Sequence, residues 1–287
     1  MVGGGIVGVS CAYYLASRGA HVTLVERDAA DGDRQGASVG NAGIIAPDHA
    51  PLPQPGLSRT LVHAMLSRTN PLYIKPRLDP ELFAWLWGFW RACGAKRFAR
   101  SMEALTQLGR ISDACFHVLR DEAKIDGGYC DTGRLEIFRT VRGMDEAKRR
   151  LELAQQYGFE VERVSGDALR AQGDVWRDEV MGAIRFKEGG YANPGQFLSE
   201  LTALAVKKGV EIVERAKVVD VRQRRDIARG VGSPTVGLSR GIVSFWQRAS
   251  GARAWHGRQA YICPCRRARG TTSNLQDWMR TLKQQAC

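Results

Sequence analysis

The sequence lacks any apolar run as long as the roughly 18–20 residues that a membrane-spanning helix needs. Its first residues also lack a basic stretch followed by an apolar one, so we expect no secretory signal. Cysteine is sparse: the seven residues are odd in number and scattered, which does not suit a disulfide framework. These absences indicate a reducing compartment, and we expect a cytoplasmic location.

Acidic residues are scarce only in the last part of the chain. Residues 222–287 hold 13 Lys and Arg but 2 Asp and Glu, whereas the first 221 residues hold 29 and 28. The formal net charge of +12 therefore lies almost entirely in the tail. A nearly neutral body argues against a specific nucleic-acid-binding protein, and we expect the tail to bind anions only nonspecifically.

The amino-acid composition of the chain changes near residue 223. Twelve of the thirteen basic residues that follow Val221 are arginine, and isolated tryptophans occur without periodicity. We expect residues 223–287 to form a disordered basic tail, and we interpret them as an out-of-frame translation of GC-rich DNA ended by a chance stop. Cys263 and Cys265 with the distant His256 do not match a zinc spacing, so no metal site is predicted.

A glycine-rich motif near the start carries the clearest chemical signal. Gly3, Gly5 and Gly8 precede an apolar pattern typical of a helix over residues 9–18, with Gly19 as its stop. A short apolar strand over residues 22–25 then ends at Glu26. The three glycines permit a tight turn, the close approach of a pyrophosphate and helix packing, and an acid at an offset of about 20 residues binds ribose hydroxyls. The motif predicts dinucleotide binding, and its spacing suits both NAD and FAD. The strand expected before the glycines is reduced to residues 1–2.

Residues 3–43 resemble the FAD-dependent D-amino-acid oxidase superfamily, and within it the bacterial D-amino-acid dehydrogenase group. The similarity is carried by GGGIVGVSCAYYLASRGAHVTLVERD and GASVGNAGIIAP, and more weakly by DTGRLEIFRT and GGYANPGQFLSELTALAVKKGVEI. It extends over roughly residues 3–222 and implies FAD as the cofactor. The resemblance adds further candidate FAD contacts, namely Arg27, Ser38, Asn41, Ala42, Gly43 and, on a strand expected over residues 217–221, Val218.

The resemblance also implies an α/β fold with a Rossmann-like FAD-binding domain and an inserted α+β substrate domain. We expect the FAD-binding domain over residues 1–75 and 190–222, the substrate domain over 76–189, and the tail over 223–287. The C-terminal third of the family should contain an Ala-Ala-Gly strand and a Gly-His-Gly-like segment, and neither occurs here. The C-terminal part of the fold is therefore expected to be missing.

The implied reaction is oxidation of a D-amino acid to a 2-oxo acid and ammonia, with hydride transfer to flavin N5 and electrons passed to an acceptor other than oxygen. Two alternatives stay open: a glycine or sarcosine oxidase-like enzyme, and an inactive fragment that keeps part of the nucleotide-binding half. The substrate carboxylate calls for an arginine, often with a tyrosine hydroxyl. Arg134, Arg139 and Tyr191 are candidates, none of them assigned, and no catalytic residue is predicted.

Residues 82–90 are dense in aromatic side chains and lead into Arg91, Lys96, Arg97 and Arg100. This pattern predicts a helix buried in the substrate domain. The alternative is an interfacial helix with basic flanks that contacts the inner face of a membrane. Elsewhere the periodicity predicts helices over residues 102–124, 144–157 and 194–208, and strands over 133–138, 180–186 and 210–213.

Overall fold

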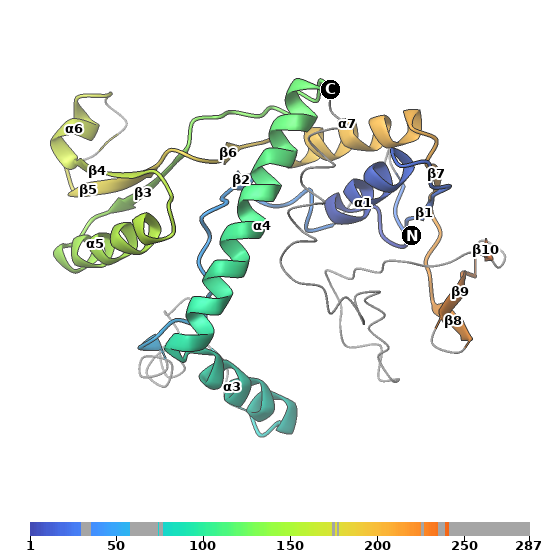
Figure 1. Ribbon diagram of the computed structural model, residues 1–287, viewed down its shortest axis with the longest axis horizontal. Helices are drawn as coiled ribbons and strands as arrows, with labels where there is room; N and C mark the ends of the chain where they lie inside the picture. Colours follow the sequence, from blue (N-terminus) through green and yellow to red (C-terminus); the bar gives the residue numbers. More distant parts are fainter. Residues whose placement is uncertain are drawn as a thin grey trace. The chain divides into compact units, whose positions relative to one another are not determined.

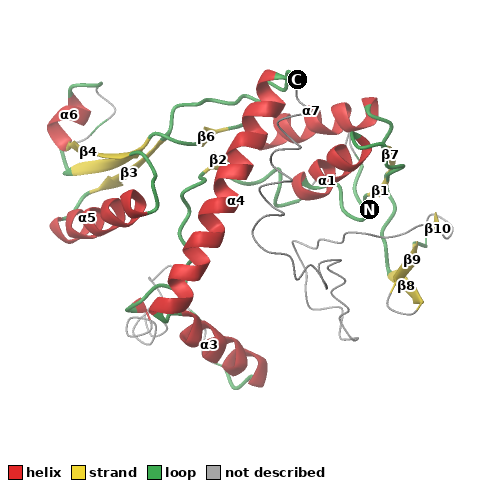
Figure 2. Ribbon diagram, in the orientation of Figure 1, coloured by secondary structure: helices red, strands yellow, loops and turns green. Residues whose placement is uncertain are grey.

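The chain forms two compact units with an α/β fold in this computed structural model (Figures 1 and 2). The structure describes residues 1–29, 36–57, 74, 77–173, 176, 178–224, 227–234 and 239–240. Met1–Asn41 and the chain from Pro194 onward make up the first unit, and Ala42–Asn193 make up the inserted unit. The unit boundaries thus follow residues 41 and 193, whereas the family resemblance implied domain boundaries after residues 75 and 189.

The first unit is built around a short parallel sheet. Its elements are α1 (Ile6–Ala16), β1 (Thr23–Val25), α7 (Pro194–Lys207), β7 (Glu211–Val213), β8 (Asp220–Arg224), β9 (Ile227–Gly232) and β10 (Ser239–Arg240). Strand β1 pairs in parallel with β7, with Thr23 opposite Glu211, and Val2 forms a parallel bridge with Val25 on the other side. The reduced first strand is therefore present as a single bridge.

Helices α1 and α7 pack against each other in the first unit (Figure 1). The buried face of α1 consists of small residues and Val9, whereas α7 buries Phe197, Leu198 and Leu201. Because small side chains on one helix leave room for large ones on its neighbour, the two helices share a close-packed contact. The predicted stops Gly19 and Gly209 both have positive φ, of 80° and 89°, as residues just beyond a helix often do.

Regular structure continues past residue 222, where the sequence pattern predicts that it stops. Strands β8 and β9 form an antiparallel hairpin, and β10 pairs with β9. Val231 is buried in a cluster with Val25 and Ala216, so this part of the basic segment packs on the end of β1. The late strand begins at Asp220 rather than Lys217. The predictions for residues 225–226, 235–238 and 241–287 fall outside the described residues.

The inserted unit contains a three-stranded antiparallel sheet in the order β3-β5-β4. Its elements are β2 (Ile44–Ile45), α3 (Pro80–Ala92), α4 (Ala95–Asp121), β3 (Arg134–Phe138), α5 (Val141–Gln156), β4 (Val161–Ser165), α6 (Gly166–Arg170), β5 (Gly182–Phe186) and β6 (Gly190–Tyr191). Strand β2 pairs with β6, with Ile44 opposite Tyr191. None of the helices in the described part of the chain is long and apolar enough to cross a membrane.

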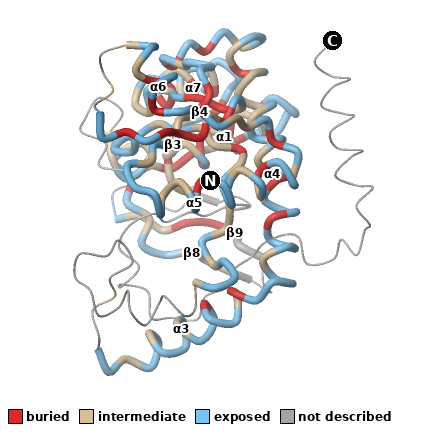
Figure 3. The backbone as a smooth tube through the Cα atoms, turned by 90° about the vertical axis from the view of Figure 1, so that its left-hand side faces the viewer, coloured by how far each residue is buried: buried red, intermediate tan, exposed pale blue. Residues whose placement is uncertain are grey.

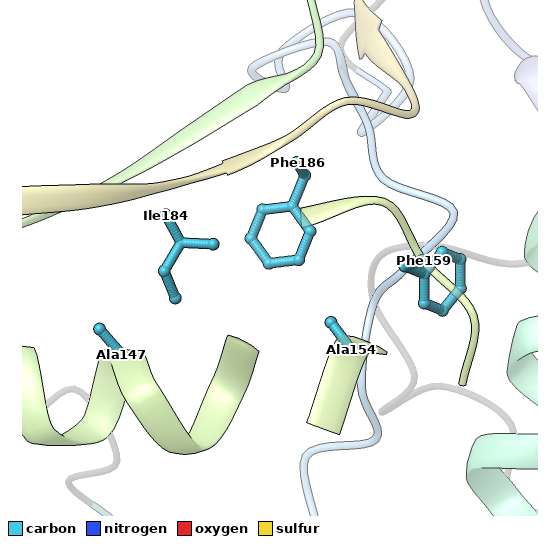
Figure 4. Close-up of a cluster of buried hydrophobic side chains, with 5 residues drawn as sticks. All are labelled: Ala147, Ala154, Phe159, Ile184 and Phe186. Atoms are coloured by element: carbon cyan, nitrogen blue, oxygen red, sulfur yellow. The ribbon is translucent and has the colours of Figure 1, made fainter. Parts of the chain in front are cut away.

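The central strand β5 buries side chains on both faces of the sheet. Ile184 and Phe186 point toward Ala147 and Ala154 of α5 (Figure 4). Ala183, on the opposite face, lies in a second cluster with Val164 of β4 and Leu169 of α6. Burial on both faces explains why residues 180–186 show an apolar run rather than alternation.

Helix α3 is exposed on most of its surface, so the prediction of a buried helix is wrong (Figure 3). Within it only Phe89 is buried. The helix begins at Pro80 behind Asp79, whose carboxylate accepts a hydrogen bond from the Glu81 N–H at 2.9 Å. A single stripe at helical spacing suffices to anchor such a helix, which leaves its other aromatic side chains uncovered.

Tyr129, which follows α4, should ionise at unusually high pH. Its ring lies against Phe116, with centroids 6.4 Å apart, and beneath the Arg120 guanidinium at 5.1 Å. Burial, reinforced by the charges of Asp131 and Asp113, raises the pKa of Tyr129 to about 12. Because the folded-state pKa exceeds the unfolded value of about 10, stability from the neutral phenol should be lost as pH rises from 10 to 12.

An alkaline absorbance titration of the wild type and of Tyr129→Phe checks this expectation. The difference in phenolate absorbance between the wild type and the variant should rise near pH 12. The free energy of unfolding should fall less steeply above pH 10 in the variant than in the wild type. A difference curve centred near the ordinary tyrosine value of about 10 would contradict the buried setting of this phenol.

Candidate nucleotide site

The glycine-rich turn joins the Val2 bridge to α1 in the first unit. Gly3 has a φ of 97°, and its N–H donates to the Val25 carbonyl at 2.9 Å. A Cβ placed on Gly8 would overlap the carbonyl oxygen of Gly3. The turn and the helix therefore approach each other at a distance that only glycine allows at residue 8.

Two side-chain oxygens meet the N-terminal end of α1. The Glu26 carboxylate accepts hydrogen bonds from the Gly4 N–H and, at 2.9 Å, from the Asp28 N–H. The Ser38 hydroxyl accepts from the Ile6 N–H at 3.0 Å. A Cβ on Gly5 would lie 2.9 Å from the Ser38 Oγ, so Gly5 gives this oxygen room. The structure thus brings together Gly5, Glu26 and Ser38 although 33 positions separate the first from the last.

The electrostatics of this end of α1 suit an anion. The first-turn N–H groups of a helix have no partner within the helix, and together with the helix dipole they favour negative charge. The first turn of α1 contains no acidic residue. Glu26 and Ser38 already accept from the Gly4 and Ile6 N–H groups, and of the motif glycines Gly3 and Gly5 are half-buried while Gly8 is buried. These residues fit a dinucleotide, with N–H groups for the pyrophosphate and a carboxylate for ribose hydroxyls.

Removing the Ser38 hydroxyl tests its contact with α1. We expect Ser38→Ala to lower the free energy of unfolding by about 0.5–2 kcal/mol, as for the loss of a helix cap, because the Ile6 N–H loses its acceptor. Ser10→Ala is the matched control, since the Ser10 hydroxyl donates to the Ile6 carbonyl at 2.7 Å within the helix. Urea unfolding of both variants measures the difference, and equal losses would contradict a capping role for Ser38.

The other predicted FAD contacts lie in varied settings. The exposed Arg27 pairs with Asp28 at 2.9 Å, and the pKa of Arg27 is raised by this hydrogen bond. Asn41 donates through Nδ2 to the Ala37 carbonyl at 2.9 Å. Ala42 is exposed, and Gly43, with a φ of 66°, accepts from the Ala192 N–H at 2.9 Å. These contacts are all with other groups of the protein. Binding of FAD by these residues therefore stays a prediction.

Val218 lies just before β8 rather than inside a strand. It packs half-buried against the cluster of Val25, Ala216 and Val231. The same cluster lies at the end of β1, next in sequence to Glu26. Val218 is therefore in the same unit as the glycine turn, and its contact with adenine stays a prediction.

The three candidates for the substrate carboxylate differ sharply in their surroundings. Arg134 is 13% exposed, and its guanidinium pairs with Asp48 and Glu136 and lies 4.2 Å from the centroid of the Phe186 ring. Glu136 also pairs with Arg150 at 2.8 Å. The positive charge of Arg134 is thus already neutralised by two carboxylates of the inserted unit, Asp48 and Glu136.

Arg139 and Tyr191 lie nearer the surface. Arg139 is 66% exposed and pairs with Glu179. Tyr191 ends β6, and its backbone exchanges hydrogen bonds with Cys130 at 2.7 and 3.0 Å. Each of the three candidates thus has different hydrogen-bond or ion-pair partners. Asp48 and Glu136, the partners of Arg134, were missed because neither belongs to a recognisable motif, although the charged Glu136 within an apolar strand was a usable signal.

Comparison with known proteins finds a matching family and similar sequences. The model of the family described as "FAD dependent oxidoreductase" (DAO) matches residues 1–253, so the similarity continues past residue 222. A D-amino acid dehydrogenase of Phenylobacterium zucineum is 33% identical over 215 residues, covering 74% of this chain and 50% of that protein. D-amino acid dehydrogenase 1 of Mesorhizobium japonicum is 31% identical over 216 residues, covering 74% and 51%.

Solved structures show the same fold. Glycine oxidase from Bacillus cereus matches with a TM-score of 0.57 at 20% identity, over 83% of this chain and 51% of that one. L-Proline dehydrogenase from P. horikoshii matches with a TM-score of 0.57 at 17% identity, over 83% and 49%. The chain thus spans about half the length of the relatives it matches.

Proposed function

We propose, from the premise that this chain belongs to the FAD dependent oxidoreductase (DAO) family, that it oxidises D-amino acids to 2-oxo acids and ammonia. The family implies FAD as the cofactor. The observation that supports FAD most directly is the end of α1, where Glu26 and Ser38 meet the glycine turn. Support for D-amino acids comes from the dehydrogenases that are 33% and 31% identical.

In this proposal the first unit is a Rossmann-like FAD-binding domain and the inserted unit holds the substrate. Gly3, Gly5 and Gly8 keep the α1 backbone open to the pyrophosphate. Glu26 accepts hydrogen bonds from ribose hydroxyls, and Ser38 supports the helix end. The remaining candidates, Arg27, Asn41, Ala42, Gly43 and Val218, complete the proposed contacts with FAD.

When bound, FAD supplies the acceptor for the hydride that leaves the substrate α-carbon. The chain's part is to bind and orient. The substrate carboxylate needs a cation, and Arg134 is a poor choice because Asp48 and Glu136 already surround it. We therefore place Arg134 in the framework of the inserted unit. Of the other two candidates, the exposed Arg139 could supply the cation and Tyr191 a hydroxyl, and neither is assigned.

Anaerobic spectroscopy of the FAD-loaded chain tests this function. D-Amino acids should bleach the visible flavin absorbance, and their L-enantiomers should not. Adding a dye as the electron acceptor should restore the flavin absorbance while the dye becomes reduced, whereas air should restore it only slowly. Bleaching by glycine or sarcosine, followed by release of peroxide once air is admitted, would favour the oxidase alternative instead. Stable FAD binding without reduction by any amino acid would overturn the proposed activity for this chain, and failure to bind FAD would overturn the site.

A further inference from the structure

Helix α4 carries an apolar stripe on the side opposite its packed face. The packed face includes Met102 and Thr106, which are both buried. It also includes Gly109, where an added Cβ would overlap the Pro47 carbonyl oxygen. Because a helix turns by about 100° per residue, a second set of side chains lies about half a turn away from these positions. This set, which we call the α4 stripe, consists of Leu108, Ile111, Cys115 and Val118.

The α4 stripe has the spacing of a coiled-coil seam. Its members follow one another at intervals of three, four and three residues, as the a and d positions of a heptad do. A stripe of this width packs against a second helix rather than against a broad surface. Much of α4 is exposed (Figure 3). Leu108 and Val118 are 58% and 38% exposed, whereas Ile111 and Cys115 are half-buried. The stripe is therefore open to a helix of a partner.

The α4 stripe is free of charge, and so are the positions beside it. The sequence over residues 104–118 contains Arg110 and Asp113 as its formally charged side chains, and both lie away from the stripe. Arg110 donates to the Tyr157 carbonyl at 3.0 Å, and Asp113 lies 3.5 Å from His117. An uncharged seam can meet a copy of itself without repulsion, and its burial leaves no charge unpaired.

We propose that two copies of the chain associate through the α4 stripe, with their α4 helices antiparallel about a two-fold axis. Such a contact buries the same seam on both copies. With the axis between Ile111 and Cys115, these two side chains of different copies lie side by side, and Leu108 of each copy lies beside Val118 of the other. A parallel pair would instead bring two basic helix starts together, since residues 95–100 contain three basic residues and no acidic one. The proposal does not depend on the reaction proposed above.

The expected dimer is weak. Helix α4 has 27 residues and is therefore about 40 Å long. A contact between one such helix from each copy is smaller than the interface of about 1,200–2,000 Å² that a stable complex buries. We therefore expect a dissociation constant of about 1–100 µM.

Sedimentation equilibrium of the full 287-residue chain at about 1–200 µM tests the proposal, because dimerisation depends on concentration. Leu108→Lys and Val118→Glu should each weaken dimerisation more than about tenfold, because each buries an unpaired charge in the seam. The double variant should regain most of the lost affinity, because the introduced lysine of one copy lies beside the introduced glutamate of the other. Within one helix these two positions are too far apart to pair, so recovery requires two copies.

The matched controls place the same charges at exposed apolar positions elsewhere. Val206→Lys and Val141→Glu change side chains that are 50% and 67% exposed, and both variants should dimerise like the wild type. A chain that stays monomeric over the whole concentration range would overturn the proposal. So would α4 variants that dimerise as tightly as the controls, because another surface would then join the copies. A double variant as weak as the single ones would overturn the antiparallel pairing.

Discussion

Replacing Gly8 by alanine is expected to lower the free energy of unfolding by about 1–3 kcal/mol, as overpacking does. The new Cβ would overlap the Gly3 carbonyl oxygen, and this atom belongs to a backbone turn that has little room to move. At an ordinary helical position the same change raises helix stability by about 1 kcal/mol. The sign of the effect therefore reports the close approach of turn and helix. FAD binding should weaken as well, because the displaced turn is the proposed pyrophosphate site.

Gly40→Ala is the matched control in the same unit. A Cβ on Gly40 meets no atom within 4 Å, so we expect a change within about 0.5 kcal/mol, typical of surface positions. Urea unfolding measures the stability of both variants, and quenching of flavin fluorescence measures FAD binding. If Gly8→Ala matched Gly40→Ala in both measurements, the tight glycine turn would not exist as described.

Replacing Arg134 by alanine is expected to destabilise the chain by about 3–5 kcal/mol, the loss seen when one partner of a buried ion pair is removed. Its partner Asp48 is only 5% exposed and would be left as an uncompensated buried charge. Arg139→Ala is the control, because Arg139 and Glu179 are both more than half exposed. A pair in that setting contributes about 0–1 kcal/mol.

The pH dependence of the Arg134→Ala variant identifies the cause of the loss. Burial raises the pKa of Asp48 above its ordinary range even beside Arg134. A carboxyl whose folded-state pKa is raised loses stability as pH rises above the unfolded value of about 4. The deficit of the variant should therefore grow from acidic to neutral pH, as measured by urea unfolding. A deficit that does not change with pH would indicate lost packing against Phe186 instead.

How much the sequence could predict depended on how far apart the interacting residues lie. The glycine motif, α1, β1 and Glu26 lie within one local unit, and their pattern predicted both elements correctly. The pairing of Ser38 with the Ile6 N–H had no local signal, and Ser38 became a candidate only through the family resemblance. Arg134 and Asp48 lie 86 positions apart, so nothing in the sequence could reveal that Arg134 was already paired.

Burial was harder to predict than helix formation. The aromatic residues of α3 predicted a helix, but composition does not tell how many faces of a helix its neighbours cover. Strand β4 was missed because its charged residues interrupt the apolar pattern, whereas the continuous apolar run of β5 was recognised. The hairpin of β8 and β9 was missed because its sequence contains more arginine than valine, so the valines that pack against Val25 and Ala216 give no clear apolar pattern.

The pairing of β1 with β7 has a consequence for the order in which the chain can fold. Thr23 and Glu211 are separated by 188 positions, and the whole inserted unit lies between them. During synthesis the glycine turn and β1 leave the ribosome early, but β1 cannot pair until β7 has also been synthesised. Closing so long a loop is slow, and it costs less when the intervening residues have already collapsed. The inserted unit should therefore fold first and act as the connector that brings β1 and β7 together.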